Sequence, residues 1–369
     1  MSAVPPVSAS ESPRPELLPV PDITWLETGD NFRIRLARYR REGANKGPVI
    51  VVHGIYVSST MFTLPTLTEN FAQFLCRRGY DVWLLDWRAS IILPVRQFTL
   101  DQAAEYDFPK AVDHIWNETG KNPIQAVVHC VGAMAFFMSM ARGLLSGKLR
   151  CVACSQVALH PRVPLFMQMK TKAGLAKLLS RAGITEVSPK ADPRYPLFSK
   201  MLAAYVNSVH MECSSTTCHR WTFMDGHLYP HDNLNLETHD RLDEFVGACN
   251  IQTLRHLEQA AVRGVMARFD YGPETNLGLY KSETPPTYVE TADPAGFAGV
   301  RIKFVFGGAN EVFCPLSSQV TLNWLRALCR SSADLYRCEE IPGYGHWDTF
   351  AGARANINTY PAFLELLES

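Results

Sequence analysis

Short apolar runs alternate with segments of helical spacing along two stretches of the chain. Residues 48–54 form one such run, which ends at a glycine, as expected of a strand buried on both faces. Further strands are predicted at 81–87, 124–130, 149–159, 300–306 and 335–340, and helices at 67–78, 99–120, 133–145, 317–329 and after Trp347. This β-α-β alternation predicts an α/β fold with a mostly parallel sheet, right-handed crossovers and helices on both faces.

The alternation stops after residue 161 and resumes near residue 299. The intervening segment carries helical stretches, clustered Cys and His residues and a Pro-rich exit. We therefore predict one α/β core in two parts, 22–161 and 299–369, with residues 162–298 inserted between them as a large cap. Residues 1–21 are rich in Pro, Ser and Glu, and we predict that this N-terminal segment is disordered.

The junction between the strand at 124–130 and the next helix carries the strongest chemical signal. The strand ends at His129-Cys130, and Gly132 follows in a turn of small residues. A strand-to-helix turn of this kind holds a nucleophile exposed in a strained position. Cys130 occupies the nucleophile position of a G-x-S-x-G pattern, although Val128 replaces the first glycine. The competing interpretation is a buried structural cysteine, which is common at strand ends.

An activated cysteine needs a base, and the base needs a group that orients it. His346 follows the last predicted strand and is flanked by glycines, whereas Glu311 follows the strand before it. Because the carboxyl ends of parallel strands meet at one edge of a sheet, we expect Cys130, His346 and Glu311 to form a catalytic triad. Asn310 and Asp348 are alternatives to Glu311, and Asp348 fits better as the start of the last helix or as a supporting contact.

These motifs resemble those of the α/β-hydrolase fold. Residues 52–55 resemble the turn that supplies an oxyanion-hole amide, and residues 85–88 resemble the segment after the following strand. A closer similarity is to the hydrolase-like region attached to cholesterol-oxidase-type flavoproteins, through residues 81–86, 104–107, 129–130, 231–235 and 343–346. Polyhydroxyalkanoate synthases, which share the cysteine elbow, are a more distant likeness. A G-x-G-x-x-G motif is missing near the N-terminus, so we expect no flavin and no other cofactor.

The resemblance implies an oxyanion hole of backbone amides. Val131, directly after the nucleophile, is expected to supply one amide, and Ile55 or Tyr56 the other. His53 and Gly54 belong to the same turn and are expected nearby. His129, beside the nucleophile, either modulates its electrostatic field or packs as a neighbour.

Charge and composition narrow the possible partners. The net charge is zero and the pI is near 7.1, so the chain lacks the basic character of a nucleic-acid-binding protein. No apolar run reaches the roughly 20 residues that cross a bilayer, and the N-terminal segment lacks the apolar stretch of a secretory signal. We therefore expect a cytoplasmic protein with reduced thiols, with no nucleic acid partner and no membrane span. The oligomeric state stays open.

A second group of cysteines and histidines lies in the predicted cap. Cys213 and Cys218 lie near His219, His227 and His231. Structural zinc, polar loop packing and a local disulfide all remain open, because no familiar spacing completes four zinc ligands. We therefore assign no metal site from the sequence.

The combined pattern predicts a hydrolase that cleaves an ester, lactone or thioester of an apolar acyl or polycyclic substrate through an acyl-cysteine. An acyltransferase or cyclase using the same intermediate is one alternative, and a non-catalytic small-molecule-binding homologue is another. Apolar residues of the cap are expected to line the pocket in part: Phe166, Met167, Met169, Met201, Leu202, Tyr205, Trp221, Phe223, Met224 and Tyr229.

Overall fold

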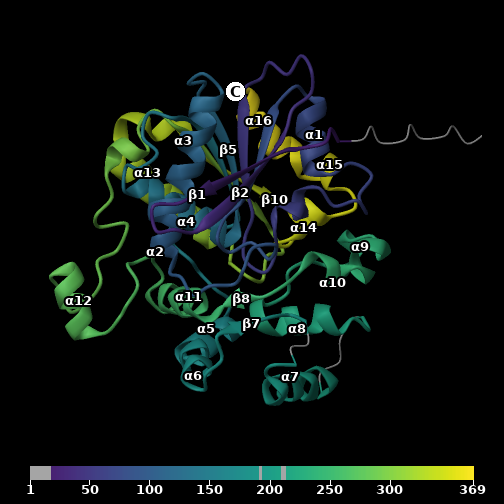
Figure 1. Cartoon of the computed structure of the whole chain (residues 1–369), viewed down its shortest axis with the longest axis vertical. Helices are drawn as coiled ribbons and strands as arrows, with labels where there is room; N and C mark the ends of the chain where they lie inside the picture. The colour runs from purple at the N-terminus through teal and green to yellow at the C-terminus, as the bar shows by residue number, and fades with distance from the viewer. Residues whose placement is uncertain (1–17, 191–192, 209–212) are drawn as a thin grey trace, which may run out of the picture.

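An eight-stranded sheet forms the centre of the computed structural model, which describes residues 18–190, 193–208 and 213–369 (Figure 1). The strand order is β1-β2-β4-β3-β5-β6-β9-β10. β1 and β2 are antiparallel, β2 runs antiparallel to β4, and all further pairs are parallel. The bounds are Asp22–Glu27 (β1), Arg33–Tyr39 (β2), Pro48–Val52 (β3), Asp81–Asp86 (β4), Ile124–His129 (β5), Leu149–Ser155 (β6), Arg301–Gly307 (β9) and Tyr336–Ile341 (β10).

Helices cover both faces of this sheet, which confirms the predicted α/β-hydrolase fold class. On one face α1 (Phe71–Arg77) packs against α16 (Tyr360–Glu368) through edge-to-face contacts of Phe71 and Phe74 with Tyr360. The other face carries α3 (Phe108–Glu118), α4 (Cys130–Ala141) and α13 (Leu316–Leu328). α4 is buried along its whole length, as expected for a helix under both a sheet and neighbouring helices.

Two predictions about the core need correction in detail. The predicted helix at 99–120 is three consecutive pieces, α2 (Leu100–Gln102), a π-helical turn at Ala103–Asp107 and α3. The predicted final helix is also divided, into α14 (Asp348–Ala351), α15 (Ala355–Asn358) and α16. The antiparallel strands β1 and β2 were not predicted, although Ile34 and Leu36 of β2 alternate with exposed or half-exposed arginines as a half-buried strand requires.

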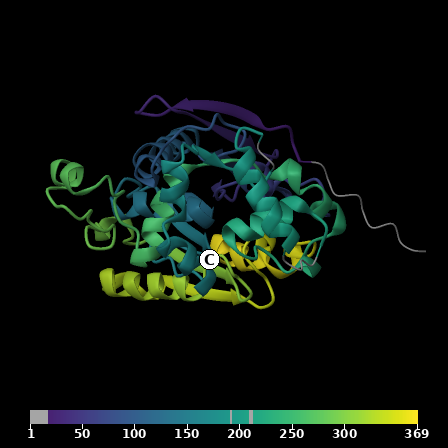
Figure 2. The same ribbon diagram turned by 90° about the horizontal axis from the view of Figure 1, so that it is seen from below.

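The insertion between β6 and β9 lies across the carboxyl ends of the parallel strands, as the view from below shows (Figure 2). Its elements are α5 (Leu165–Lys172), α6 (Leu175–Arg181), β7 (Glu186–Val187), α7 (Pro196–Ser208), α8 (Thr216–Asp225), η3 (His231–Asn233), α9 (Leu236–Asp240), α10 (Leu242–Phe245), β8 (Cys249–Asn250), α11 (Ile251–Arg263), α12 (Pro273–Tyr280) and η4 (Pro294–Gly296). Within the insertion β7 and β8 pair antiparallel, a short pairing that the sequence pattern did not predict. No helix in the described ranges is both long and apolar enough to span a membrane.

Candidate active site

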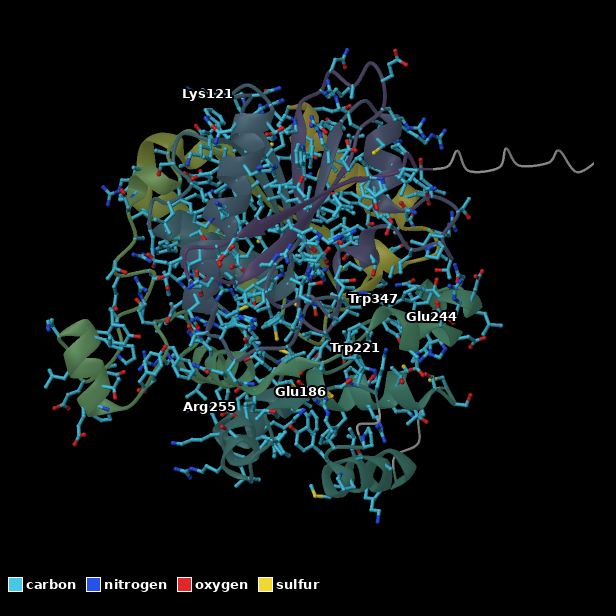
Figure 3. The ribbon with its side chains drawn as sticks, viewed as in Figure 1. Lys121, Glu186, Trp221, Glu244, Arg255 and Trp347 are labelled. Carbon is cyan, nitrogen blue, oxygen red and sulfur yellow. The ribbon has the colours of Figure 1, made fainter. Side chains whose placement is uncertain are left out.

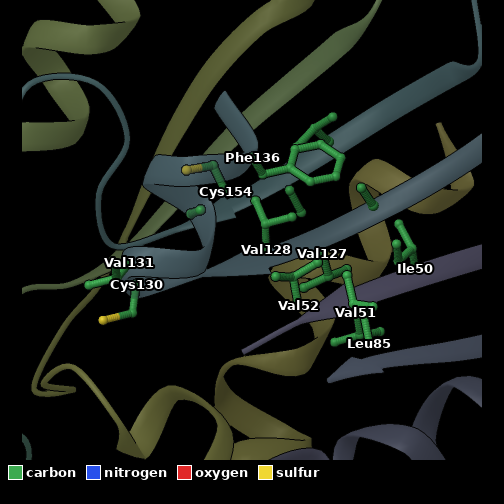
Figure 4. Packing of buried hydrophobic residues seen from close by; sticks show 14 of the residues in the cluster. Ile50, Val51, Val52, Leu85, Val127, Val128, Cys130, Val131, Phe136 and Cys154 are labelled. Carbon is green, nitrogen blue, oxygen red and sulfur yellow. The ribbon is translucent and has the colours of Figure 1, made fainter. Parts of the chain in front are cut away.

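Cys130 lies at the sharp junction between β5 and α4, with no loop residue between the strand and the helix. Its φ is +56°, in the left-handed region that a non-glycine residue adopts only at a cost of about 1–3 kcal/mol. Figure 4 shows the sulfur pointing away from the packed side chains of Val127 and Val128. The structure therefore has a strained strand-to-helix turn at Cys130, and the strain holds the thiol beyond the end of the strand; the role of this thiol as a nucleophile stays a prediction.

Two glycines permit the backbone around Cys130 to pack closely. A Cβ atom on Gly132 would lie 2.1 Å from the carbonyl oxygen of His53, so only glycine lets α4 approach the end of β3. A Cβ atom on Gly54 would lie 2.8 Å from Cβ and 3.0 Å from Sγ of Cys130. The loop after β3 therefore lies directly against the thiol.

The backbone N–H groups of Val131 and Ile55 lie beside the Cys130 sulfur, where they lower the pKa of the thiol. They come from the start of α4 and from the loop after β3, which are the two sources of an oxyanion hole in this kind of turn. Tyr56, the alternative donor, instead adopts a φ of +63° and places its buried side chain in the wall of the cavity. The geometry brings Val131 and Ile55 together as the candidate pair of donors.

His346 lies in the loop between β10 and α14, and its imidazole reaches the thiol. One ring nitrogen of His346, one of His129 and the Cys130 sulfur lie within 4.8 Å of one another. The side-chain amide of Asn310 lies 3.3 Å from Nδ1 of His346. The Nε2 atom on the other side of the ring is buried and has no hydrogen-bond partner among the described residues, which leaves it available to the sulfur and to a substrate.

The structure does not bring Glu311 to the imidazole. The side chain of Glu311 is exposed, whereas its neighbour Asn310 is buried and makes the contact with His346. Glu311 instead contributes its backbone, because its carbonyl packs closely against Gly226 of the cap. Of the three orienting residues that the sequence offered, Asn310 is therefore the one in contact with the ring.

A network of backbone groups fixes the orientation of the Asn310 amide. Its Oδ1 accepts from the N–H groups of Val312 and Phe313, at 2.9 and 3.1 Å. Its Nδ2 donates to Oε1 of Gln156 at 2.8 Å, and Gln156 is itself held by the backbone of Gly307 and His346. The NH₂ group of Asn310 therefore faces Nδ1 of His346. Because Nδ1 must accept this bond, the neutral imidazole carries its proton on Nε2.

Asp348 supports the loop and does not touch the ring in any recorded contact. It is the first residue of α14, and its carboxylate accepts from the N–H of Gly345 at 2.9 Å and from the amide of Asn233 at 2.6 Å. Burial raises the pKa of the Asp348 carboxyl to about 6. The carboxylate therefore connects the loop between β10 and α14, residues 342–347, to the cap through Asn233. This loop is called the histidine loop below.

Two further histidines pack around Cys130. The ring of His129 bonds to Ser155 Oγ at 2.9 Å and lies 4.9 Å from the ring of His346. His53 bonds through Nδ1 to the carbonyl of Gly54 at 2.7 Å, which shapes the loop that carries Ile55. Burial lowers the pKa of both imidazoles, so neither adds a positive charge beside the thiol at neutral pH.

Burial sets the protonation states of Cys130 and His346. It raises the pKa of the Cys130 thiol to about 12, against the opposing effect of the two amides, and it lowers the pKa of His346 to about 3. At neutral pH the pair is therefore a neutral thiol and a neutral imidazole, rather than the thiolate and imidazolium of a more solvated pair.

A cavity of about 160 Å³ opens above the thiol between the core and the cap. Most of its lining is apolar and comes from the loop after β3, from α5, α6, α8 and α11, and from the histidine loop. Of the cap residues expected there, Met167, Trp221, Phe223 and Met224 line it. Phe166, Met169 and Met201 are exposed, Leu202 and Tyr229 are buried outside the lining, and the side chain of Tyr205 lies outside the described part of the chain.

One charged pair lies in this apolar lining, and sequence reasoning missed it. Asp225 at the end of α8 and Lys170 in α5 both face the cavity. Trp221 donates to Asp225 at 3.0 Å, and Lys170 donates to the carbonyl oxygens of Phe223 and Met224. Burial raises the pKa of Asp225 and lowers that of Lys170, while each charge opposes the shift of the other. The two residues are 55 positions apart (225 − 170), so no sequence motif could have paired them.

Comparison with known proteins places this geometry in a family. The profile of the alpha/beta hydrolase family matches residues 49–355, which is most of the chain and includes both Cys130 and His346. The chain therefore belongs to the alpha/beta hydrolase family.

Several of the more similar relatives are lipases. The chain is 25% identical to lipase member K of Mus musculus over 346 residues, covering 89% of this chain and 81% of that protein. It is 24% identical to gastric triacylglycerol lipase of Rattus norvegicus over 360 residues, covering 91% and 84%. A monoglyceride lipase of Saccharomyces cerevisiae shares the fold at a TM-score of 0.56, with 14% identity and 97% of both chains covered. The chain is thus an alpha/beta hydrolase of the lipase- and esterase-like kind.

Proposed function

We propose that this protein hydrolyses an ester of an apolar acyl group through an acyl-cysteine formed on Cys130. One observation carries the proposal: a strained thiol, two backbone amides and an imidazole converge at the end of an apolar cavity. The lipase and esterase relatives support the choice of an ester over other carbonyl compounds.

In the first step the sulfur of Cys130 attacks the carbonyl carbon of the ester. The thiol proton passes to His346, and the carbonyl oxygen gains a negative charge that the amides of Val131 and Ile55 stabilise. Each such donor typically contributes about 3–4 kcal/mol to the transition state. The C–O bond then breaks, the alcohol leaves with the proton from His346, and the acyl group remains on the sulfur as a thioester.

In the second step water takes the place of the alcohol. His346 accepts a proton from the water as its oxygen attacks the thioester carbonyl, again with the oxyanion facing the two amides. The C–S bond breaks, the proton returns to the sulfur, and the carboxylic acid leaves. A second nucleophile in place of water would make the same enzyme an acyltransferase.

The resting network opposes the first proton transfer. Nε2 of His346 carries the ring proton, so the thiol proton has an acceptor only after the ring proton moves to Nδ1. Nδ1–H then needs an oxygen acceptor, which a half-turn of the Asn310 amide supplies at the expense of its bonds to Val312, Phe313 and Gln156. We infer that this exchange precedes acylation and slows turnover.

The same network favours a second candidate function. A protein that keeps the cavity but holds its imidazole in the unproductive tautomer would bind apolar molecules with little turnover. The high pKa of the Cys130 thiol points in the same direction, because only the thiolate is strongly nucleophilic.

For the substrate, a mostly apolar cavity whose lining also includes Asp225, Lys170 and Glu258 fits an acyl chain or a polycyclic body that carries a polar group. Asp225 and Lys170 are the polar groups that would recognise it. The likeness of residues 343–346 to cholesterol-oxidase-associated hydrolase regions favours a polycyclic body and stays a prediction.

Intact-mass spectrometry of the protein after incubation with p-nitrophenyl esters from acetate to laurate tests the proposal. We expect an acyl adduct and turnover that are lost in Cys130→Ala and in His346→Ala, and retained in Cys314→Ala, which removes a half-buried thiol outside the cavity lining. Thermal melting of each variant separates loss of chemistry from loss of fold.

Two results would overturn the proposed hydrolase. An adduct that persists in Cys130→Ala places the chemistry elsewhere. The absence of any adduct or turnover, together with a rise in melting temperature when fatty acids or sterols are added, selects the binding protein instead.

A further inference from the structure

Four side chains of the cap bring metal-ligating atoms together, away from the candidate active site. Cys213, Cys218, His231 and His239 each contribute one sulfur or ring nitrogen, and these four atoms lie within 4.8 Å of one another. They belong to three separate pieces of chain: the start of α8 with the residues before it, η3, and α9. Both cysteines are free thiols in the structure.

We propose that these four residues bind a structural zinc ion. Two thiolates and two imidazoles are a ligand set that Zn²⁺ prefers in closed tetrahedral sites. With Zn–S near 2.3 Å and Zn–N near 2.0 Å, a tetrahedron separates a sulfur from a nitrogen ligand by about 3.5 Å. Cys218 Sγ and His231 Nε2 are 3.5 Å apart, so this pair already has the spacing that a bound ion requires.

His239 supplies a second, independent observation. Its Nε2 atom is buried and lacks a hydrogen-bond partner among the described residues, which is costly for a polar atom and is resolved by a metal bond. On the opposite side of the ring, Nδ1 lies 3.8 Å from the carboxylate of Asp240. A carboxylate behind a ligating imidazole is the arrangement that orients histidine toward zinc.

Polar neighbours also surround the two sulfurs. The hydroxyl of Tyr229 donates to Cys218 at 3.2 Å, and Nε2 of His219 lies 3.3 Å from the sulfur of Cys213. Donors of this kind stabilise metal-bound thiolates from outside the ligand set. His219 is outside the group of four whose ligand atoms converge, and we assign it to this supporting role.

The position of the cluster gives the ion a structural task. η3 begins at His231 and ends at Asn233, whose amide bonds to Asp348 and to the carbonyl of Gly343 in the histidine loop. α8 begins beside Cys218 and ends at Asp225 in the cavity wall. An ion that joins these segments would hold the cavity wall and the histidine loop in register, without taking part in the reaction.

Metal content and cobalt substitution of the full-length protein test this site. We expect about one equivalent of zinc per chain after purification under reducing conditions, and visible cobalt–thiolate absorption when Co²⁺ replaces the zinc. Cys218→Ser and His239→Gln should each lose most of both signals, whereas Cys338→Ser, at an exposed cysteine outside the cluster, should keep them. Removal of zinc by a chelator should lower the melting temperature of the parent protein and of Cys338→Ser, and should leave that of Cys218→Ser and His239→Gln unchanged.

The wild-type measurements stand even if a variant fails to fold. Zinc below about a tenth of an equivalent together with no cobalt–thiolate absorption would overturn the site. Peptide mapping that finds Cys213 and Cys218 joined as a disulfide in freshly prepared protein would overturn it as well. Equal zinc content in the parent protein and in His239→Gln would remove His239 from the ligand set and refute the four-ligand site.

Discussion

Among the described residues, two groups of cysteine and histidine bring their sulfur and ring-nitrogen atoms within 4.8 Å of one another, and the surroundings of the two groups differ completely. At the sheet edge one sulfur, Cys130, faces the imidazoles of His129 and His346 together with two backbone N–H groups. In the cap two sulfurs and two imidazoles converge, and the hydroxyl of Tyr229 donates to the sulfur of Cys218. Trp221 and Trp347, with ring centroids 5.4 Å apart, mark the contact between the cap and the core (Figure 3).

The comparison indicates that the backbone around each group, more than the Cys and His residues themselves, determines what the group can bind or stabilise. At Cys130, backbone amides beside a strained residue suit a negative charge that develops only in a transition state. The cap group offers four convergent ligands, which suit a permanently bound cation. Cys and His would therefore stabilise an anion at Cys130 and a cation in the cap. The following substitutions should affect the two groups differently.

The largest effect should come from Cys130→Ala. Loss of the nucleophile should reduce ester turnover by at least about 10³-fold, as for other catalytic nucleophiles. Zinc content should not change, because the cap group is separate. Steady-state kinetics and metal analysis of the same preparation measure the turnover and the zinc content. A fall in zinc content would show that the cap group depends on Cys130, contrary to the comparison.

Gly132→Ala tests the crowded backbone that distinguishes the sheet-edge group. The added Cβ would meet the carbonyl oxygen of His53 at 2.1 Å, which should cost about 3 kcal/mol of unfolding free energy or more. Gly278→Ala in α12 is the matched control, because its Cβ meets nothing within 4 Å and alanine favours a helix by about 1 kcal/mol. Urea unfolding of both variants would contradict the packing if Gly132→Ala were as stable as its control.

His346→Gln tests the burial of an uncharged imidazole. The pKa of His346 is about 3 in the fold and near 6.5 when unfolded, so its stabilisation is present above pH 6.5 and is lost as the pH falls toward 3. Between pH 7.5 and pH 4 the wild type should therefore lose about 3 kcal/mol more stability than His346→Gln. The unfolding free energies come from urea unfolding at the two pH values. An equal loss of unfolding free energy in the wild type and in His346→Gln would show that the ring is solvated in the native state.

Asn310→Asp should produce the smallest effect and sharpen the comparison most. A carboxylate at this position accepts from Nδ1–H, raises the pKa of His346 and frees Nε2 to take the thiol proton. Alkylation of Cys130 by iodoacetamide at pH 7 should accelerate about tenfold, equivalent to about 1.4 kcal/mol. Asn117→Asp, at an exposed position of α3, is the charge-matched control. Unchanged alkylation would indicate that the amide does not set the tautomer.

Much of the core was predictable because buried parallel strands leave continuous apolar runs. β3, β5 and β9 are buried over nearly their whole length, and each was predicted. β1 was missed because an edge strand with exposed Ile23 and Trp25 breaks the expected alternation. Within the cap, short helices separated by turns leave no dominant period, so only the presence of an insertion was predictable.

The candidate site divides in the same way. Cys130, His346 and Val131 follow strand ends, and the sheet brings their loops to one edge. Whether Asn310 or Glu311 faces the imidazole depends on the conformation of the turn after β9. Hydrogen bonds from the N–H groups of Val312 and Phe313 to Asn310 fix that conformation, and sequence spacing does not show them. His239 joins the cap cysteines only because α9 folds back toward η3.

The attachment of the histidine loop to the cap restricts the way a substrate enters. The carbonyl of Leu228 accepts from the N–H groups of both His346 and Trp347, at 2.7 and 2.9 Å, and Asn233 bonds to Gly343 and Asp348 in the same loop. If this part of the cap lifted, the imidazole would leave the sulfur together with it. The cap is therefore fixed to the core at residues 228–233. By contrast, α5 and α6, which also line the cavity, carry Leu165, Phe166 and Leu178 exposed to solvent.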